Sequence, residues 1–255
     1  KAITVNASNI NDPPVVSNPA AVTVNEDTSL AFTAGNAITV SDPDLFSGSM
    51  TVTLGVTHGK LTVGSAGGAT VTGSATAAVT LTGTSSQLAT ALGSLSYQGA
   101  TDYHGADTLS IDVSDNGNFG AGGAKTTSGS VAITVVPVND TPTLSAPAAT
   151  QSLSTGSTVT FSTANGNAIV VADAKDSGTA PFTDNQQMTV TTASGTLVLA
   201  TTSGLTVTGD GTGTVVLTGS LADINTALDG LVFTAANPNL DGTVVVTATL
   251  DDLDN

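Results

Sequence analysis

Cysteine, tryptophan and arginine are all absent from this sequence of 255 residues. Without cysteine, neither disulfides nor cysteine-based zinc sites can stabilise the chain. Aromatic residues make up only 3% of the chain, so any core must be built mainly from Val, Leu, Ile and Ala. No run of 18 apolar residues occurs, and the sequence therefore predicts no transmembrane helix.

Positive charge is scarce as well. Four lysines face 20 acidic residues, which gives a formal net charge of −16. Nucleic-acid binding and attraction to anionic membranes both depend on Lys and Arg, so we expect neither nucleic acid as a partner nor membrane insertion. Glu26 is the one glutamate, and every other acid is an aspartate. Because so many carboxylates repel one another, we expect cations to lie among them.

The sequence repeats itself. Residues 81–97 align with residues 217–233, sharing Leu-Thr-Gly, Thr-Ala-Leu and a later Leu, and apolar positions match apolar ones. Upstream at the same offset, Gly59-Lys60-Leu61 aligns with Gly195-Thr196-Leu197. The length also exceeds that of an ordinary single domain. Two tandem repeats are therefore predicted.

A second repeated sequence marks the boundaries between repeats. Ala2-Ile3-Thr4-Val5 recurs as Ala132-Ile133-Thr134-Val135, and each copy precedes an Asn-Asp pair and a proline. Repeat two has no counterpart of residues 118–140, and we expect it to be C-terminally truncated. The expected segments are the last strand and linker of a preceding repeat, repeat one with its linker, and repeat two, at residues 1–12, 13–140 and 141–255.

Within each repeat the pattern predicts an all-β fold. Short alternating runs such as residues 50–56 and 131–135 are bounded by Gly, Asn and Asp, as in half-buried strands. About seven strands per repeat indicate an immunoglobulin-like β-sandwich. Helical spacing interrupts the strands in residues 85–95, where Ser85 is the predicted N-cap, and again after Ser220, which forms a predicted capping box with Asp223. We expect a short helical crossover in each sandwich.

Several short motifs occur in a fixed order. They are Asn-Glu-Asp-Thr at 25–28, Ser-Asp-Pro-Asp at 41–44, Val-Thr-His-Gly-Lys-Leu at 56–61, Tyr-x-Gly-x-Asp-Thr-Leu at 103–109 and Val-Asn-Asp-x-Pro at 138–142. In this order they resemble the cadherin-like and immunoglobulin-like tandem repeats of large bacterial surface adhesins of the repeats-in-toxin (RTX) type. The resemblance covers essentially the whole chain, and it implies calcium bound where one repeat meets the next.

The residue types agree with calcium. Ca²⁺ takes six to eight oxygen ligands, and carboxylates two residues apart, such as Asp42 and Asp44, can reach one ion from a single loop. By analogy with cadherins, the ligands expected at the upstream junction are Asp12, Asp42, Asp44 and Asp115. Those expected at the downstream junction are Glu26, Asp27, Asp102 or Asp107, Asn139 and Asp140, completed by Asp173, Asp176 and Asp251 of repeat two.

Two alternatives limit these assignments. Any single aspartate can instead serve a turn or a helix cap. Repeat two has Ser154-Thr155-Gly156 where repeat one has Asn25-Glu26-Asp27, which leaves open whether it keeps a distal calcium site. Catalytic motifs are missing, and neither His58 nor His104 recurs in the second repeat, so we expect no enzyme.

These patterns predict calcium-rigidified extender repeats of a secreted adhesin on a bacterial cell surface, projecting a distal binding domain. The expected partners are neighbouring repeats of the same chain and a cell-surface or matrix ligand. One alternative is direct glycan binding, for which the loop aromatics are Tyr103, Phe119 and Phe182. The other is a self-associating surface-layer component, since residues 1–5 read as a strand without a repeat of their own.

Overall fold

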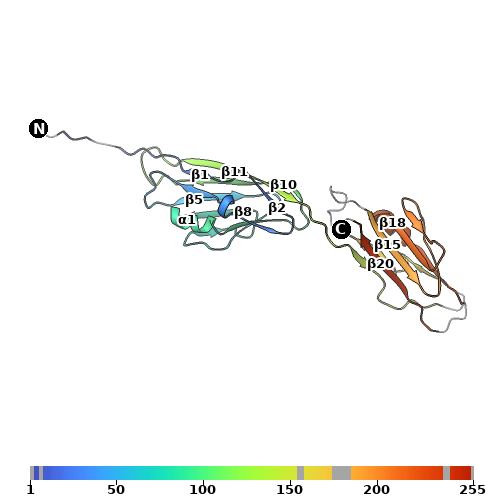
Figure 1. The fold of residues 1–255 in the computed structure, drawn as a ribbon. Helices are drawn as coiled ribbons and strands as arrows, with labels where there is room; N and C mark the ends of the chain where they lie inside the picture. Colours follow the sequence, from blue (N-terminus) through green and yellow to red (C-terminus); the bar gives the residue numbers. More distant parts are fainter. Residues whose placement is uncertain (1–2, 6–7, 154–157, 174–184, 238–241, 254–255) are drawn as a thin grey trace. The chain divides into compact units, whose positions relative to one another are not determined.

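The computed structural model describes residues 3–5, 8–153, 158–173, 185–237 and 242–253. The chain is mostly β and divides into two compact units, Lys1–Val138 (unit 1) and Asn139–Asn255 (unit 2) (Figure 1). This division falls two residues before the boundary expected after residue 140. Among the described residues, no helix has the length and apolar character needed to cross a membrane.

Unit 1 is a sandwich of two main sheets. The larger sheet has the strand order β2 (Ala21–Asn25), β11 (Thr126–Val136), β10 (Gly105–Ser114), β5 (Met50–Gly55), β8 (Ala78–Gly83) and β7 (Thr70–Thr72). The second sheet has the order β3 (Ser29–Ala31), β9 (Leu95–Gly99) and β6 (Gly59–Val63). A separate pair joins β1 (Val15–Ser17) to β4 (Thr39–Ser41), and η1 (Ala34–Asn36) is a single 3₁₀ turn.

The core of unit 1 follows from alternation along its strands. Successive side chains of a strand point to opposite faces, and β10 buries every second one. β11 behaves in the same way, and its Val131, Ile133 and Val135 are each at most 1% exposed. β2 pairs in parallel with β11, while all other strand pairs of this sheet are antiparallel.

Unit 2 repeats this plan with fewer strands. One sheet has the order β17 (Thr206–Thr208), β18 (Thr214–Ser220), β15 (Asn185–Thr192) and β20 (Val246–Asp252). The other has the order β13 (Thr158–Phe161), β19 (Leu231–Ala235) and β16 (Gly195–Val198). A further pair joins β12 (Thr143–Ser145) to β14 (Val170–Ala172). Met188, Leu217 and Phe233 lie in its core.

Each unit carries one short helix, α1 (Ser85–Leu92) and α2 (Leu221–Leu228). Ser220 is the N-cap of α2, and its Oγ accepts a hydrogen bond from the amide of Asp223, as predicted. The N-cap of α1 is Thr84 rather than the predicted Ser85, because Gln87 reaches back to the Thr84 amide and starts the helix one residue earlier. The predicted all-β fold of two sandwiches with a helical crossover in each is confirmed.

The Gly-x-Leu repeat motif has a structural cause. A Cβ on Gly59 would lie 2.4 Å from the carbonyl oxygen of Gln98 and 2.7 Å from the ring of Tyr97. A Cβ on Gly195 would meet Phe233 and the carbonyl of Thr234, each at 2.5 Å. Glycine is thus required wherever the start of β6 or β16 crosses closely over the neighbouring strand β9 or β19.

Candidate metal centre

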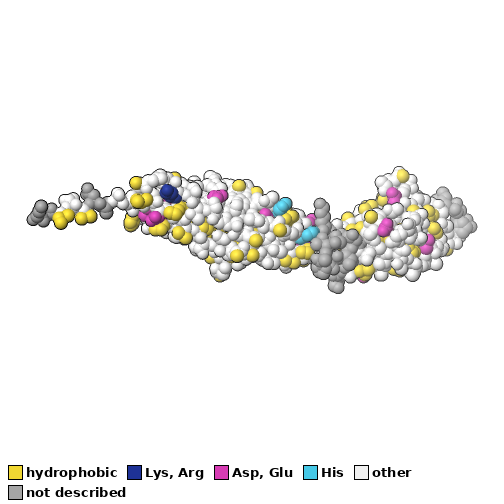
Figure 2. Space-filling view, turned by 90° about the horizontal axis from the view of Figure 1, so that it is seen from above, with side chains coloured by type: hydrophobic (Ala, Val, Ile, Leu, Met, Phe, Trp, Pro, Cys, Tyr) yellow, Lys and Arg dark blue, Asp and Glu magenta, His cyan; other side chains and the backbone are white. Residues whose placement is uncertain are grey.

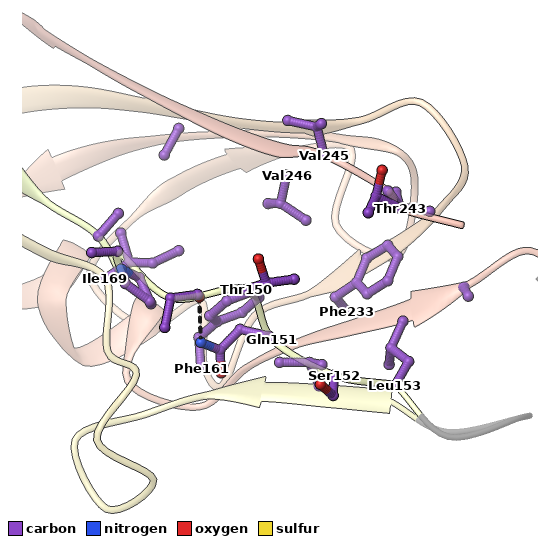
Figure 3. A pocket seen from close by; sticks show the side chains of 18 of the residues that line it. Thr150, Gln151, Ser152, Leu153, Phe161, Ile169, Phe233, Thr243, Val245 and Val246 are labelled. Carbon is purple, nitrogen blue, oxygen red and sulfur yellow. Dashed lines mark hydrogen bonds between the residues drawn. The ribbon is translucent and has the colours of Figure 1, made fainter. Parts of the chain in front are cut away.

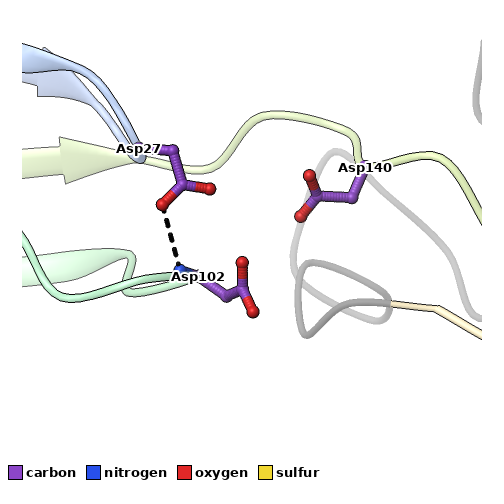
Figure 4. A group of neighbouring side chains, drawn as sticks. All are labelled: Asp27, Asp102 and Asp140. Atoms are coloured by element: carbon purple, nitrogen blue, oxygen red, sulfur yellow. Dashed lines mark hydrogen bonds between the residues drawn. The ribbon is translucent and has the colours of Figure 1, made fainter.

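Three carboxylates converge where the chain leaves unit 1. Asp27 lies in the turn after β2, Asp102 in the turn after β9, and Asp140 in the linker, residues 137–142. Each offers an oxygen, and these oxygens all lie within 4.8 Å of one another (Figure 4). Among the residues that the structure describes, this is the one group of three or more His, Cys, Asp or Glu side chains that could share an ion in this way. The sequence predicted Asp27 and Asp140, together with either Asp102 or Asp107, as ligands of the downstream junction.

Local backbone geometry positions two of these acids. Asp27 and Asp102 both have a φ of 54°, in the left-handed region that Asp and Asn tolerate better than most residues. The amide of Asp102 donates to Oδ1 of Asp27 over 3.3 Å, which holds the two turns together. Aspartate at these turns therefore serves the backbone as well as the cluster.

Glu26 fastens the start of the linker to unit 1. The residue is only 3% exposed, and its Oε1 accepts a 2.6 Å hydrogen bond from the amide of Val138. Its Oε2 lies 3.6 Å from Nδ1 of His104, which forms an ion pair when the imidazole is protonated. The amide of Glu26 also donates to the carbonyl of Val136. The side chain of Glu26 thus holds the start of the linker by a direct hydrogen bond, next in sequence to Asp27 of the cluster.

Asp107, another predicted ligand, is engaged by the protein itself. Its two oxygens accept hydrogen bonds from the amides of Thr57, His58 and Thr108 and from the hydroxyl of Tyr97. Burial raises the pKa of Asp107, but these hydrogen bonds outweigh burial and hold the pKa below its ordinary value. Asp107 is not part of the group formed by Asp27, Asp102 and Asp140.

At the opposite end of unit 1, Asp115 organises a second group of polar residues. Asp115 is 1% exposed and accepts hydrogen bonds from the side chain of Asn11 (2.6 Å) and from the amides of Gly117 and Lys125 (2.8 Å each). Burial raises the pKa of Asp115. The hydrogen bonds from Lys125, Gly117 and Asn11 lower it by more, so the pKa lies below its ordinary value. Asn11 also bonds to the carbonyl of Ala121 through its amide.

The predicted upstream ligands Asp12, Asp42 and Asp44 lie in this same group. The amide of Asp12 donates to Oδ2 of Asp44, and the amide of Asp44 donates to Oδ1 of Asp42, each over 3.1 Å. Burial raises the pKa of Asp42, and the neighbouring carboxylates of Asp44 and Asp115 raise it further. Asp42, Asp44 and Asp115 therefore repel one another, and a bound cation would relieve this repulsion.

Unit 2 reproduces part of this arrangement. The side chain of Asn139 donates to Oδ2 of Asp252 over 2.5 Å, the same contact that Asn11 makes with Asp115 in unit 1. Asp173 accepts a hydrogen bond from Gln186, whereas Asp251 is exposed on β20. The last of the predicted ligands, Asp176, falls outside the residues that the structure describes.

Asp252 is the residue that the sequence analysis missed. It is 5% exposed and follows Asp251, which the prediction selected instead. Aligning Asp112-Val113-Ser114-Asp115 with Thr249-Leu250-Asp251-Asp252 would have matched Asp252 to Asp115. The pairing of β10 with β5 and of β20 with β15 supports that alignment.

The loop aromatics are occupied within the protein. The ring of Tyr103 stacks on His58 with centroids 4.4 Å apart, and its hydroxyl donates to the carbonyl of Ala106. Phe119 meets Phe46 edge to face at 5.9 Å. Phe182 lies outside the described residues. These contacts give no specific support to glycan binding.

The donor chemistry of the cluster fits calcium. Asp27, Asp102 and Asp140 supply only carboxylate oxygens, and a hard cation such as Ca²⁺ takes oxygen ligands. Positive side chains are sparse on the face of the molecule drawn in Figure 2, which leaves few protein cations to neutralise the acids. The residues present therefore suit Ca²⁺ better than zinc, which prefers nitrogen and sulfur ligands.

No family model matches the sequence, and no curated protein matches it. Among solved structures, the chain is similar to domains 1–6 of the surface layer protein SbsC, with 16% identity, a TM-score of 0.23, and coverage of 99% of this chain and 27% of that one. Domains EC3–6 of protocadherin gammaB7 have 13% identity and a TM-score of 0.26, and the match covers 94% of this chain and 48% of that one. The collagen adhesin of S. aureus has 9% identity and a TM-score of 0.20, and the match covers 97% of each chain. The chain thus spans about a quarter to a half of the first two proteins, and at these TM-scores the fold assignment rests on the strand order and register described above.

Proposed function

We propose that this chain is an extender segment of an extracellular surface adhesin, that calcium stiffens it, and that its role is mechanical rather than catalytic. The observation that carries the proposal is the group of Asp27, Asp102 and Asp140, whose carboxylate oxygens lie within 4.8 Å of one another. Asp27 and Asp102 lie in turns of unit 1, and Asp140 lies in the linker, two residues after the end of unit 1. An ion bound by all three restrains the linker where it leaves the sandwich.

The contact between Glu26 and Val138 supports this mechanism. It already ties the first part of the linker to unit 1, so an ion at Asp140 has only a short stretch of chain left to order. When bound, Ca²⁺ supplies the positive charge that this acidic chain lacks. Its dissociation constant should be about 10⁻⁴–10⁻³ M, as in other extracellular modules, which suits a cell surface bathed in millimolar calcium.

The proposed partners are neighbouring repeats of the same protein and a ligand on another cell or in a matrix. The RTX type of adhesin inferred from the sequence motifs belongs to this proposal too. The net charge of −16 disfavours both nucleic acid and anionic membranes as partners.

Calcium titration with thermal melting tests the proposal. Both tyrosines, Tyr97 and Tyr103, lie in unit 1 and there is no tryptophan, so tyrosine fluorescence follows the unfolding of unit 1 alone. Calcium at ten times its dissociation constant should stabilise the site by about 1.4 kcal/mol. The melting temperature of unit 1 should then rise by about 4 °C.

Charge-matched variants locate the site. Asp27→Asn and Asp102→Asn should fold, because Asn tolerates a positive φ, but each should lose most of the calcium-induced rise. Asp112→Asn removes the same charge from an exposed position on β10 and should keep it. A rise that survives in both Asn variants would place calcium elsewhere and refute this assignment.

Small-angle scattering tests the mechanical part. The maximum dimension of the chain should grow when calcium replaces a chelator. The distribution of this dimension among the molecules should narrow. The same dimension in both conditions would contradict stiffening by calcium even if the ion binds.

A further inference from the structure

Unit 2 buries a glutamine near the start of β15. Gln186 is 0% exposed. Its counterpart in unit 1 is Met50, because Met50 pairs with Gly83 as Gln186 pairs with Gly219, and these two glycines are equivalent in the sequence repeat. Met50 is 0% exposed as well. The same interior position is therefore apolar in one unit and polar in the other.

Only one end of the Gln186 amide has a partner. Its Nε2 donates a 2.8 Å hydrogen bond to Oδ2 of Asp173. Its Oε1 is buried and accepts no hydrogen bond from the residues that the structure describes. Exchanging the two amide atoms does not solve this, because Oε1 would then face a carboxylate, which is another acceptor. A buried carbonyl without a partner destabilises the fold, and Met50 shows that an apolar side chain fits this position.

Two carboxylates lie next to this amide. Asp173 accepts its hydrogen bond, and Asp252 is paired with Gln186 across β15 and β20, so that both side chains point to the same face of the sheet. Asp252 is 5% exposed, and its Oδ2 accepts a hydrogen bond from the side chain of Asn139. We call Asn139, Asp173, Gln186 and Asp252 the Gln186 group, and all four residues belong to unit 2.

The open cavity of unit 2 is lined by other residues. It measures about 700 Å³, and the rings of Phe161 and Phe233 are part of its lining (Figure 3). No member of the Gln186 group lines it. This cavity therefore does not open the Gln186 group to solvent.

We propose that Gln186 is a calcium ligand, and that its Oε1 completes an ion site within unit 2 together with the carboxylates of Asp173 and Asp252. Ca²⁺ takes amide carbonyls as well as carboxylates as ligands. Bound there, it supplies the positive partner that Oε1 lacks, while Nε2 keeps its hydrogen bond to Asp173. The inference rests on the proposed function in taking calcium as the ion, but it uses carboxylates other than those of the cluster that contains Asp27.

Hydrogen exchange of the whole chain, followed by mass spectrometry in peptides that contain β15, tests the proposal. Exchange is compared in calcium at ten times its dissociation constant and in chelator with sodium chloride at matched ionic strength. An ion that is released when β15 opens should slow exchange of the β15 amides about tenfold. The absence of any slowing by calcium, or equal slowing by the sodium salt, overturns the proposal.

A pair of methionine variants locates the ligand. Gln186→Met introduces the residue that unit 1 buries at this position and should fold. If the dissociation constant rises about tenfold, the ratio of exchange rates in chelator and calcium should fall to about two. A purely structural Gln186 would change both rates equally and leave the ratio at about ten, which overturns the proposal. Gln187→Met makes the same change at a half-buried position on the other face of β15 and should keep the full ratio.

A glutamate variant tests whether the partner is a cation. Gln186→Glu keeps an oxygen ligand but adds a charge beside Asp173 and Asp252. Exchange in chelator should become faster because like charges repel, and calcium should slow it by more than tenfold because a more negative ligand set binds the ion more tightly. A glutamate variant that responds to calcium no more than Gln186→Met does would overturn the proposal.

Tyrosine fluorescence of the same samples separates this inference from the proposed function, because both tyrosines lie in unit 1. A calcium-induced rise in the melting temperature of unit 1 without any slowing in β15 refutes the site at Gln186 alone. Slowing in β15 that depends on Gln186, without a rise in unit 1, supports the site at Gln186 and refutes the cluster that contains Asp27.

Discussion

The two units fill one equivalent position in different ways, with a hydrogen-bonded polar pair in unit 1 and two apolar residues in unit 2. In unit 1, the buried hydroxyl of Tyr97 donates to Oδ2 of Asp107 over 3.0 Å. In unit 2, the counterparts of these residues are Phe233 and Val244, neither of which has a polar side chain. The hydroxyl and the carboxylate are thus present together or absent together.

This difference illustrates how buried polar groups constrain a sequence. Once Asp107 is buried, Tyr97 and the amides of Thr57 and His58 depend on it, and a single substitution strands several donors. Replacing both partners by apolar residues removes that dependence, as Phe233 and Val244 do. Burial and hydrogen bonding to Asp107 also raise the pKa of Tyr97 well above its ordinary value.

The largest effect should come from converting unit 1 to the chemistry of unit 2 one residue at a time. Asp107→Val should lower the free energy of unfolding of unit 1 by about 3 kcal/mol, because buried donors lose their acceptor. Tyr97→Phe alone should cost about 1 kcal/mol. The double variant should be more stable than the sum of the two losses predicts, by about 1 kcal/mol.

Urea unfolding followed by tyrosine fluorescence measures this cycle, since Tyr103 remains as a reporter in every variant. Strictly additive losses would mean that Tyr97 and Asp107 do not depend on each other, and the comparison between the units would lose its meaning. Phe233→Tyr, which adds a hydroxyl to unit 2 without a carboxylate, is the reverse control.

Acid should distinguish the units next. The folded pKa values of Asp107 and Asp115 lie below the ordinary value of 3.8, so their stabilisation is complete above the unfolded pKa and is lost as the pH falls through the folded pKa. Unit 2 has Val244 in place of Asp107 and should lose less. In chelator, unit 1 fluorescence should therefore report unfolding at a higher pH than the remaining far-UV circular dichroism signal. Simultaneous loss of both signals would refute the distinction.

The two helix starts offer a smaller contrast. Ser220 accepts from the amide of Asp223 and donates to its Oδ2, whereas in α1 the amide of Thr84 is bound by Gln87. Ser220→Ala should destabilise unit 2 by about 1 kcal/mol. Thr84→Ala keeps the backbone contact to Gln87 and should cost less. Urea unfolding by circular dichroism compares them, and equal losses would show that the side chain of the N-cap does not set the difference.

The smallest expected effect concerns the crowded acids of unit 1. Asp42→Asn keeps an acceptor for the amide of Asp44 but removes a charge from beside Asp44 and Asp115. In chelator it should stabilise unit 1 by a few tenths of a kcal/mol, since like charges no longer repel. With calcium present the gain should vanish or reverse if Asp42 binds the ion. Melting in both conditions, with Asp112→Asn as the control, decides between these outcomes.

Repetition made the fold predictable from the sequence. Leu-Thr-Gly in residues 81–83 and 217–219 ends equivalent strands, and the helices that follow obey ordinary capping preferences. The start of α1 was displaced by one residue because Gln87 competes as a capping partner, which spacing of apolar residues does not reveal.

The candidate site was predictable only in part. Asp27, Asp102 and Asp140 come from three separate motifs, and the structure brings their carboxylates together. The sequence had assigned Asp27, Asp140 and either Asp102 or Asp107 to the downstream junction, and their role as calcium ligands stays a prediction. Residue type alone could not separate Asp107, which is saturated by hydrogen bonds, from an acid with oxygens to spare. Nor could it choose Asp252 over Asp251, because the strand face that decides burial depends on register.

The parallel pairing of β2 with β11 has a consequence for how unit 1 bears load. The chain passes through β1 into β2 and leaves after β11, and β2 and β11 run in the same direction through five paired positions. Tension applied along the chain therefore slides one strand along the other, so their hydrogen bonds resist together instead of opening one by one. Resistance to pulling depends on the rate of unfolding, and such a shear geometry slows it. A sandwich of modest equilibrium stability can then act as a strong link in a chain under tension.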